Sequence, residues 1–179
     1  MSKLYVYKPL DIGFIILCHD GSASMLWSTV SSIQVYYPNR PCVCATGEQT
    51  SDEELKIMRK KCVTRVGKNT ITSLINAGMN HAPSPWNFII IAGSHMRSGL
   101  DQKFSYFVEK EKDILFPVVD KKIYFPEGSI NGILMHRDTW KEVGDMSEYE
   151  SLELCKLEWA NRAIDKGCTF KGVVGGKIC

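Results

Sequence analysis

Apolar runs that alternate with amphipathic helical segments constrain the fold of this 179-residue chain more than any other feature. The first half reads strand, helix, strand, helix, strand, helix, strand. This alternation favours a mostly parallel, doubly wound sheet flanked by helices, because each connecting helix covers one face of the sheet. The predicted strands are 13–18, 42–45, 63–66 and 86–92, and the predicted helices begin near Ser22 or Ser24, near Ser51, and near Asn69-Thr70.

The second half is less regular, and its predictions rest on shorter runs. Leu154, Leu157, Ala160 and Ile164 form one apolar stripe on a predicted helix over 152–166, which predicts that this stripe faces the core. One α/β domain over residues 1–179 is expected. The other predicted elements are strands at 104–108, 113–119, 123–126, 130–135 and 170–174, and a short helix through Trp140 and Val143.

The charge balance and the lack of long apolar runs exclude several classes of partner. Twenty-two basic and 20 acidic side chains leave a net charge of +2, so no electrostatic reason points to nucleic acid or an anionic membrane. No apolar run approaches the roughly 20 residues that span a bilayer. The first ten residues lack the apolar stretch of a signal peptide. A cytoplasmic location is therefore expected.

The seven cysteines contain no CxxC pair. Several lie in apolar, strand-like runs, where a free thiol behaves as a small hydrophobic side chain. Reduced structural thiols are therefore predicted. A zinc site built on Cys42 and Cys44 is the alternative, although paired zinc ligands usually have about two to four residues between them and only Val43 separates these two.

Polar residues follow the first predicted strand directly. His19 and Asp20 lie at its carboxyl end, where open α/β sheets place their ligands. Asp20 is a candidate acceptor for a base or ribose, and a simple turn is the alternative. No GxGxxG motif follows a strand and no GxxxxGK[ST] loop occurs in the chain, which argues against the common dinucleotide and phosphate-loop domains.

Several segments together resemble glycosyltransferases of the GT-A fold, close to the inverting family-two group. The resemblance covers about residues 12–178 and is strongest at 76–91, which is similar to the stretch that leads into the family's central strand. It is also strong at 158–167, which is similar to the helix that carries the family's catalytic carboxylate. Weaker similarity is found at 17–20, 28–33 and 128–146, whereas 45–47 stands where the family often has an acidic pair.

The resemblance implies a nucleotide-diphospho-sugar transferase domain. Residues 12–97 would form its nucleotide-binding half, and 98–179 its acceptor-side half. Glu158 is the first candidate for the base that takes the acceptor's proton, ahead of Glu153 and Asp145; the alternative is an ordinary helix ion pair with Arg162. The acceptor would be a glycan, lipid or protein. The positions expected to contact the nucleotide sugar are His19, Asp20, Thr46, Asn76, Ser94 and Arg97.

The chain departs from the family's pattern where a metal is expected. In the family, an Asp-x-Asp motif follows the strand that matches 86–91 and holds Mn²⁺ or Mg²⁺ against the diphosphate. Here that place reads Ala92-Gly93-Ser94-His95, without a carboxylate. His95 is the candidate metal ligand that remains, and Arg97 is a candidate phosphate partner in place of the metal.

Three functions stay open. The first is an active glycosyltransferase with relaxed metal dependence. The second is a degenerate relative that serves as a binding or scaffold domain without turnover. The third is an unrelated doubly wound nucleotide-binding domain.

Overall fold

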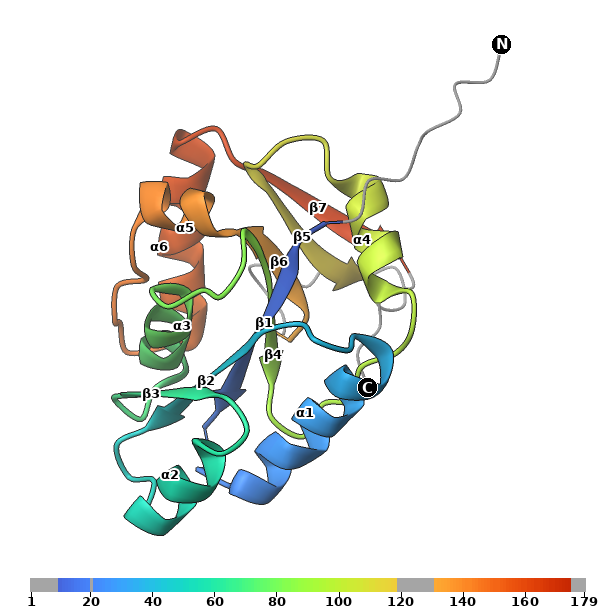
Figure 1. Ribbon diagram of the computed structural model, residues 1–179. Coiled ribbons are helices and arrows are strands. Elements are labelled where there is room, and N and C mark those ends of the chain that lie inside the picture. The colour runs from blue at the N-terminus through green and yellow to red at the C-terminus, as the bar shows by residue number, and fades with distance from the viewer. Residues whose placement is uncertain (1–9, 20, 119–130, 175–179) are drawn as a thin grey trace.

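A computed structural model describes residues 10–19, 21–118 and 131–174 as a seven-stranded sheet with six helices (Figure 1). None of these described helices is long and apolar enough to cross a bilayer. The strands are β1 (Ile12–Cys18), β2 (Cys42–Gly47), β3 (Val63–Gly67), β4 (Trp86–Ile91), β5 (Asp113–Val118), β6 (Ile133–His136) and β7 (Thr169–Val174). The helices are α1 (Ala23–Tyr36), α2 (Asp52–Met58), α3 (Ile71–Met79), α4 (Leu100–Phe107), α5 (Arg137–Val143) and α6 (Leu152–Asp165).

The strand order is β3-β2-β1-β4-β6-β5-β7. Strands β3, β2, β1 and β4 are parallel, and β5 is parallel to β7. Strand β6 is antiparallel to both of its neighbours, β4 and β5. The predicted α/β class with a mostly parallel, doubly wound sheet is therefore confirmed. The strand predicted at 123–126 lies outside the described residues.

Helices cover both faces of the sheet. On β1, Phe14 and Ile16 point to the face that carries α1, α2 and α4, whereas Ile15 and Leu17 point to the face that carries α3, α5 and α6 (Figure 1). All seven residues of β1 are buried. A strand with two covered faces needs apolar residues at successive positions, which explains the unbroken apolar run in the sequence.

The connections reverse direction beside β1. Helix α1 leads from β1 outward to β2, and α2 continues outward to β3. Helix α3 then returns over the opposite face and enters β4, on the other side of β1. The carboxyl ends of β1 and β4 thus flank a topological switch point, which is where open α/β sheets bind ligands.

The strand predicted at 104–108 is wrong, because these residues belong largely to α4. Gly99, with a φ of 74°, precedes the helix. Leu100 and Phe104 then lie one helical turn apart and are both buried. The Phe104 ring meets the Phe88 ring edge-on, with centroids 4.8 Å apart. Burial of this pair outweighs the β propensity of the aromatic run.

The prediction that the apolar stripe of α6 faces the core is also wrong for Leu154, Leu157 and Ile164, which are exposed. The buried side of α6 instead carries Trp159, which stacks on Trp140 with ring centroids 5.2 Å apart. A tryptophan buries more area than a leucine and needs a partner for its N–H. Trp159 therefore sets the rotation of the helix.

Candidate functional site

The carboxyl ends of β1 and β4 remain paired past their last residues. The N–H of Ala92 donates to the carbonyl of Leu17 at 2.9 Å, next to Cys18 and the exposed His19. His19 thus lies at the switch point, as predicted. Asp20, the other predicted contact after β1, lies outside the described residues.

Two exposed amide side chains line the same edge beyond β2 and β3. The Nε2 of Gln49 donates to the carbonyl of His19 at 2.9 Å and to the Oδ1 of Asn69. Gly47 makes room for this arrangement, because a Cβ atom at Gly47 would lie 2.1 Å from the Oε1 of Gln49. These bonds use both N–H groups of Gln49, so the Oε1 acceptor of Gln49 and the Nδ2 donor of Asn69 are the groups that suit the polar edge of a nucleobase. The sequence analysis missed both amides; their signal is that each follows a strand's carboxyl end.

Thr46 lies at the end of β2 but is wholly buried. Its hydroxyl donates to the carbonyl of Cys18 at 3.0 Å and shares a hydrogen bond of 2.7 Å with the hydroxyl of Thr50. The side chain therefore joins β1 to the turn after β2. Thr46 thus lies beneath the predicted site and supports the strand ends.

A carboxylate of the chain itself occupies the N-terminus of α1. The Oε2 of Glu54, on α2, accepts from the N–H of Ala23 at 2.8 Å, and the hydroxyl of Ser22 accepts from the N–H of Met25. Helix N-termini at strand ends bind phosphate in many nucleotide-binding proteins. Here the negative charge of Glu54 repels a phosphate from that place, so a diphosphate at this edge has to lie away from α1.

The segment after β4 leaves the sheet edge and runs along α1 toward α4 (Figure 1). The hydroxyl of Thr29 accepts from the N–H of Gly93 at 2.9 Å, and that of Ser32 accepts from the N–H of Met96 at 3.0 Å. The segment is therefore directed along the helix by hydroxyl groups of α1.

Arg97 lies at the far end of this segment. Its carbonyl accepts from the hydroxyl of Tyr37, just past the C-terminus of α1. The 14 residues of α1 extend about 20 Å, and the strand ends lie at the helix's other end. The structure therefore does not bring the exposed Arg97 to the strand ends, where its predicted phosphate would bind.

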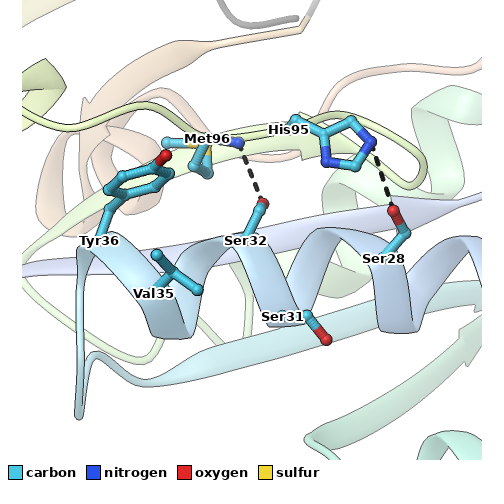
Figure 2. A pocket seen from close by; sticks show the side chains of 7 residues that line it. All are labelled: Ser28, Ser31, Ser32, Val35, Tyr36, His95 and Met96. Atoms are coloured by element: carbon cyan, nitrogen blue, oxygen red, sulfur yellow. Dashed lines mark hydrogen bonds between the residues drawn. The ribbon is translucent and has the colours of Figure 1, made fainter.

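His95 lies in an open groove of about 410 Å³ between α1 and the segment after β4. Figure 2 shows Ser28 and Ser32 directed toward this segment, with the Oγ of Ser28 3.4 Å from the Nε2 of His95. The residues that line the groove are Ser28, Ser31, Ser32, Val35, Tyr36, His95 and Met96.

The groove residues do not fit the divalent metal that the family resemblance implies. Hard cations prefer several oxygen ligands with negative charge, and His95 is surrounded by neutral hydroxyls and apolar groups. Among the described residues, no group of three or more His, Cys, Asp or Glu side chains is arranged to hold a metal ion. The role of His95 as a metal ligand therefore stays a sequence prediction.

Ser94 is buried at the end of β4, where Asn131 holds it. The Nδ2 of Asn131 donates to the hydroxyl of Ser94 at 3.0 Å, and its Oδ1 accepts from the N–H of Ile91 at 3.0 Å. Asn131, just before β6 begins, thus binds the last residue of β4 through its side chain. The sequence analysis did not single it out as a site residue; its signal is the Asn131-Gly132 pair, which is typical of a turn.

Asn76 and Glu158 are brought together, but on the helical layer rather than at the strand ends. Asn76 forms two hydrogen bonds of 2.9 Å with the backbone of Met146, one to its carbonyl and one from its N–H. Glu158 pairs with Arg162, whose guanidinium also donates to the carbonyl of Asp145. Both predicted site residues therefore hold the connection between α5 and α6.

Glu158 is a poor base in this arrangement. Both of its carboxylate oxygens accept from Arg162, whose Nη2 lies 3.0 Å from Oε2. Arg162 holds the pKa of Glu158 below its ordinary value, which favours the form that has already lost its proton but weakens its pull on another. The nearby Asp145 is exposed, and its Oδ2 accepts from the Nδ2 of Asn80 at 3.1 Å.

The six cysteines in the described part of the chain are all free thiols; the predicted thiol at Cys179 lies outside it. Cys42 and Cys44 both belong to β2, and their side chains face the layer of α1, α2 and α4. Burial raises the pKa of Cys42 to about 12. Both thiols pack among the apolar side chains of this layer, which favours the structural interpretation of these cysteines.

Comparison with known proteins finds no matching family model and no similar curated sequence.

Proposed function

We propose that this protein binds a nucleoside diphosphate, or its sugar conjugate, as a GT-A-like domain that does not turn the donor over. The observation that carries the proposal is the switch point between β1 and β4, which is flanked by exposed polar groups. Ligands of doubly wound sheets bind at such points because the diverging connections leave the strand ends accessible.

The polar groups beside β1 suit the nucleoside part of the ligand. Gln49 and Asn69 present amide groups, and His19 presents an imidazole. Amides read both donors and acceptors of a base edge. The carboxylate of Glu54 at the N-terminus of α1 directs the diphosphate toward β4 instead. Specificity in this proposal thus comes from the base rather than from a phosphate loop.

The absence of turnover in the proposal rests on Glu158. A base for glycosyl transfer has to reach the acceptor hydroxyl and draw its proton. Glu158 instead forms a two-point ion pair with Arg162, and this pair secures the connection between α5 and α6. A carboxylate with this structural task and a lowered pKa is unsuited to proton abstraction.

An active glycosyltransferase is the second candidate, and Asp145 is the observation in its favour. Asp145 lies on the same connection, is exposed, and accepts from Asn80. An exposed carboxylate with one neutral partner remains available to an acceptor hydroxyl. If the protein transfers sugar, Asp145 is a more available base than Glu158, but its partner Asn80 caps the C-terminal end of α3, away from the carboxyl ends of the strands, so the acceptor has to extend between the two.

Isothermal titration calorimetry with uridine and guanosine diphosphates tests the binding. We expect one of the two to bind, with the same affinity in the presence and absence of Mn²⁺. Gln49→Ala should weaken that affinity about tenfold, the equivalent of one lost hydrogen bond to a buried polar group. Gln34→Ala, an exposed amide on α1, is the matched control and should leave it unchanged.

Two results contradict this proposal. If neither nucleotide produces binding heat, a nucleoside diphosphate site is excluded. Binding of an adenine dinucleotide instead would favour the unrelated nucleotide-binding domain.

Assays of donor hydrolysis and sugar transfer separate the two candidates. The proposal expects no release of nucleoside diphosphate above the uncatalysed rate. Turnover that is lost in Asp145→Asn but kept in Glu158→Gln would establish the active transferase with Asp145 as its base. Turnover lost in Glu158→Gln, with stability unchanged, would restore Glu158 as the catalytic residue.

A further inference from the structure

The outward side of α6 carries side chains at coiled-coil spacing. Leu154, Leu157, Asn161 and Ile164 follow one another at intervals of three, four and three residues. Leu154, Leu157 and Ile164 are 52%, 47% and 56% exposed, respectively. This is the a/d pattern with which a helix contacts another helix along a seam, and a single Asn at an a position is a common part of that pattern.

The seam is additional to the side of α6 that packs within the chain. Cys155, Trp159 and Ala163 are buried on the opposite side. Single exposed apolar residues are ordinary in a soluble domain. Three of them in register along a helix that is already anchored by its other side form a continuous surface for a partner.

The flanks of the seam are acidic. Glu153 lies on one side of it and Asp165 on the other, at the g and e positions that select partners in coiled coils. Of the two basic residues of α6, Arg162 neutralises Glu158, and Lys156 attracts Glu153 from the buried side of the helix. Lys156 is buried, and Arg162 is directed to Glu158 and to the carbonyls before α6.

A second copy of the chain does not suit this surface. Pairing α6 with itself would bring acidic flanks against acidic flanks, which is repulsive in either orientation. The seam also consists of three half-exposed aliphatic side chains, whereas a stable dimer typically buries about 800 Å² per partner. A small apolar surface with one sign of charge fits a transient partner of the opposite charge.

We propose that the outward side of α6 docks an amphipathic helix of another protein, one with aliphatic seam residues and Lys or Arg on its flanks. The aliphatic side chains of that helix would pack against Leu154, Leu157 and Ile164. Its basic flanks would face Glu153 and Asp165. Helix-in-groove recognition commonly works with such regularly spaced anchors. The inference is independent of nucleotide binding at the strand ends.

Fluorescence anisotropy with two synthetic helices tests the proposal on the full chain. Each probe has about three heptads, with Leu at its a and d positions; one carries Lys and the other Glu at e and g. We expect the Lys probe to bind at least about tenfold more tightly than the Glu probe. This ratio should shrink as salt is raised, because exposed charge pairs are screened.

Three variants locate the binding. Leu157→Ser should weaken binding of the Lys probe about tenfold, and Asp165→Lys should reduce the preference for Lys over Glu. Val35→Ser is the matched control, because Val35 is 70% exposed on α1, in the opposite helical layer. It should leave both affinities unchanged.

Several outcomes would overturn the proposal. These are equal affinities for the two probes, no effect of Leu157→Ser, or no binding of either probe to a protein whose circular dichroism shows it folded. A dimer in sedimentation equilibrium that Leu157→Ser abolishes would identify a second copy as the occupant instead.

Discussion

Arg162 donates hydrogen bonds to both carboxylate oxygens of Glu158 and to the backbone carbonyls of Val143 and Asp145. The pair therefore ties α6 to the connection that follows α5. Glu158 therefore has a structural role, and its contribution to the free energy of unfolding can be measured by substitution.

Glu158→Gln should lower the free energy of unfolding by about 1 kcal/mol at pH 7, because a charge-assisted pair becomes a neutral one. The pKa of Glu158 is lowered in the folded state. Its contribution is therefore present above the unfolded-state pKa of about 4.3 and is lost as the pH falls through the folded-state pKa. Urea denaturation at pH 7 and about pH 3 checks this. An equal difference at both pH values would contradict it.

Tyr37→Phe should destabilise the protein by about 1–3 kcal/mol. The buried hydroxyl donates to the carbonyl of Arg97 at 2.7 Å and accepts from the N–H of Leu100 at 2.9 Å, so its loss leaves two backbone groups without this partner. Tyr36→Phe is the matched control, because the Tyr36 side chain is exposed. Thermal unfolding of both variants is the measurement; equal melting temperatures would refute the role given to Tyr37.

Asn76→Ala should cost about 1–3 kcal/mol of unfolding free energy. It removes both hydrogen bonds to the backbone of the buried Met146 and loosens the connection between α5 and α6. Amide hydrogen exchange at Met146 should accelerate accordingly. Gln34→Ala should leave exchange and stability within the small range typical of surface substitutions. Unchanged exchange at Met146 in Asn76→Ala would argue against this anchoring role.

Alkylation should distinguish two half-buried thiols near β2 and β3. A hydrogen bond with the Cys44 side chain lowers the pKa of Cys62, whereas burial raises that of Cys42 to about 12. The thiolate is the reactive form, so at pH 8 iodoacetamide should modify Cys62 well before Cys42. Peptide mass spectrometry over time measures both rates. Faster modification of Cys42 would contradict this order of thiol reactivity.

Local sequence rules predicted much of the fold. The apolar runs at β1 and β4 are buried on both faces, so their composition alone marks them as central strands. Ser22, Ser51 and Thr70 each accept a backbone hydrogen bond at a helix start, close to where the sequence predicted the three caps. These features depend on neighbours within a few residues, and the sequence displays those neighbours directly.

The placement of the candidate site residues followed the same division. His19 directly follows the predicted strand 13–18, and Ser94 lies just beyond the predicted strand 86–92, so the sequence places both near strand ends. Thr46 bonds to Cys18 and Asn76 bonds to Met146, and in both cases the partner is distant in the sequence. No local pattern predicts such contacts.

Only the tertiary structure decided that residues Leu100–Phe107 form the helix α4 and which side of α6 faces the core. The 104–108 run has strand-like composition, yet the contact between Phe104 and Phe88 stabilises a helix there. The leucine stripe of α6 has core-like composition, yet the stacking of Trp159 on Trp140 rotates it outward. In both cases a large aromatic side chain gains more by burial against a remote ring than local propensity can offset. A linear pattern records which residues are apolar, but competition between distant residues for the same core decides which of them are buried.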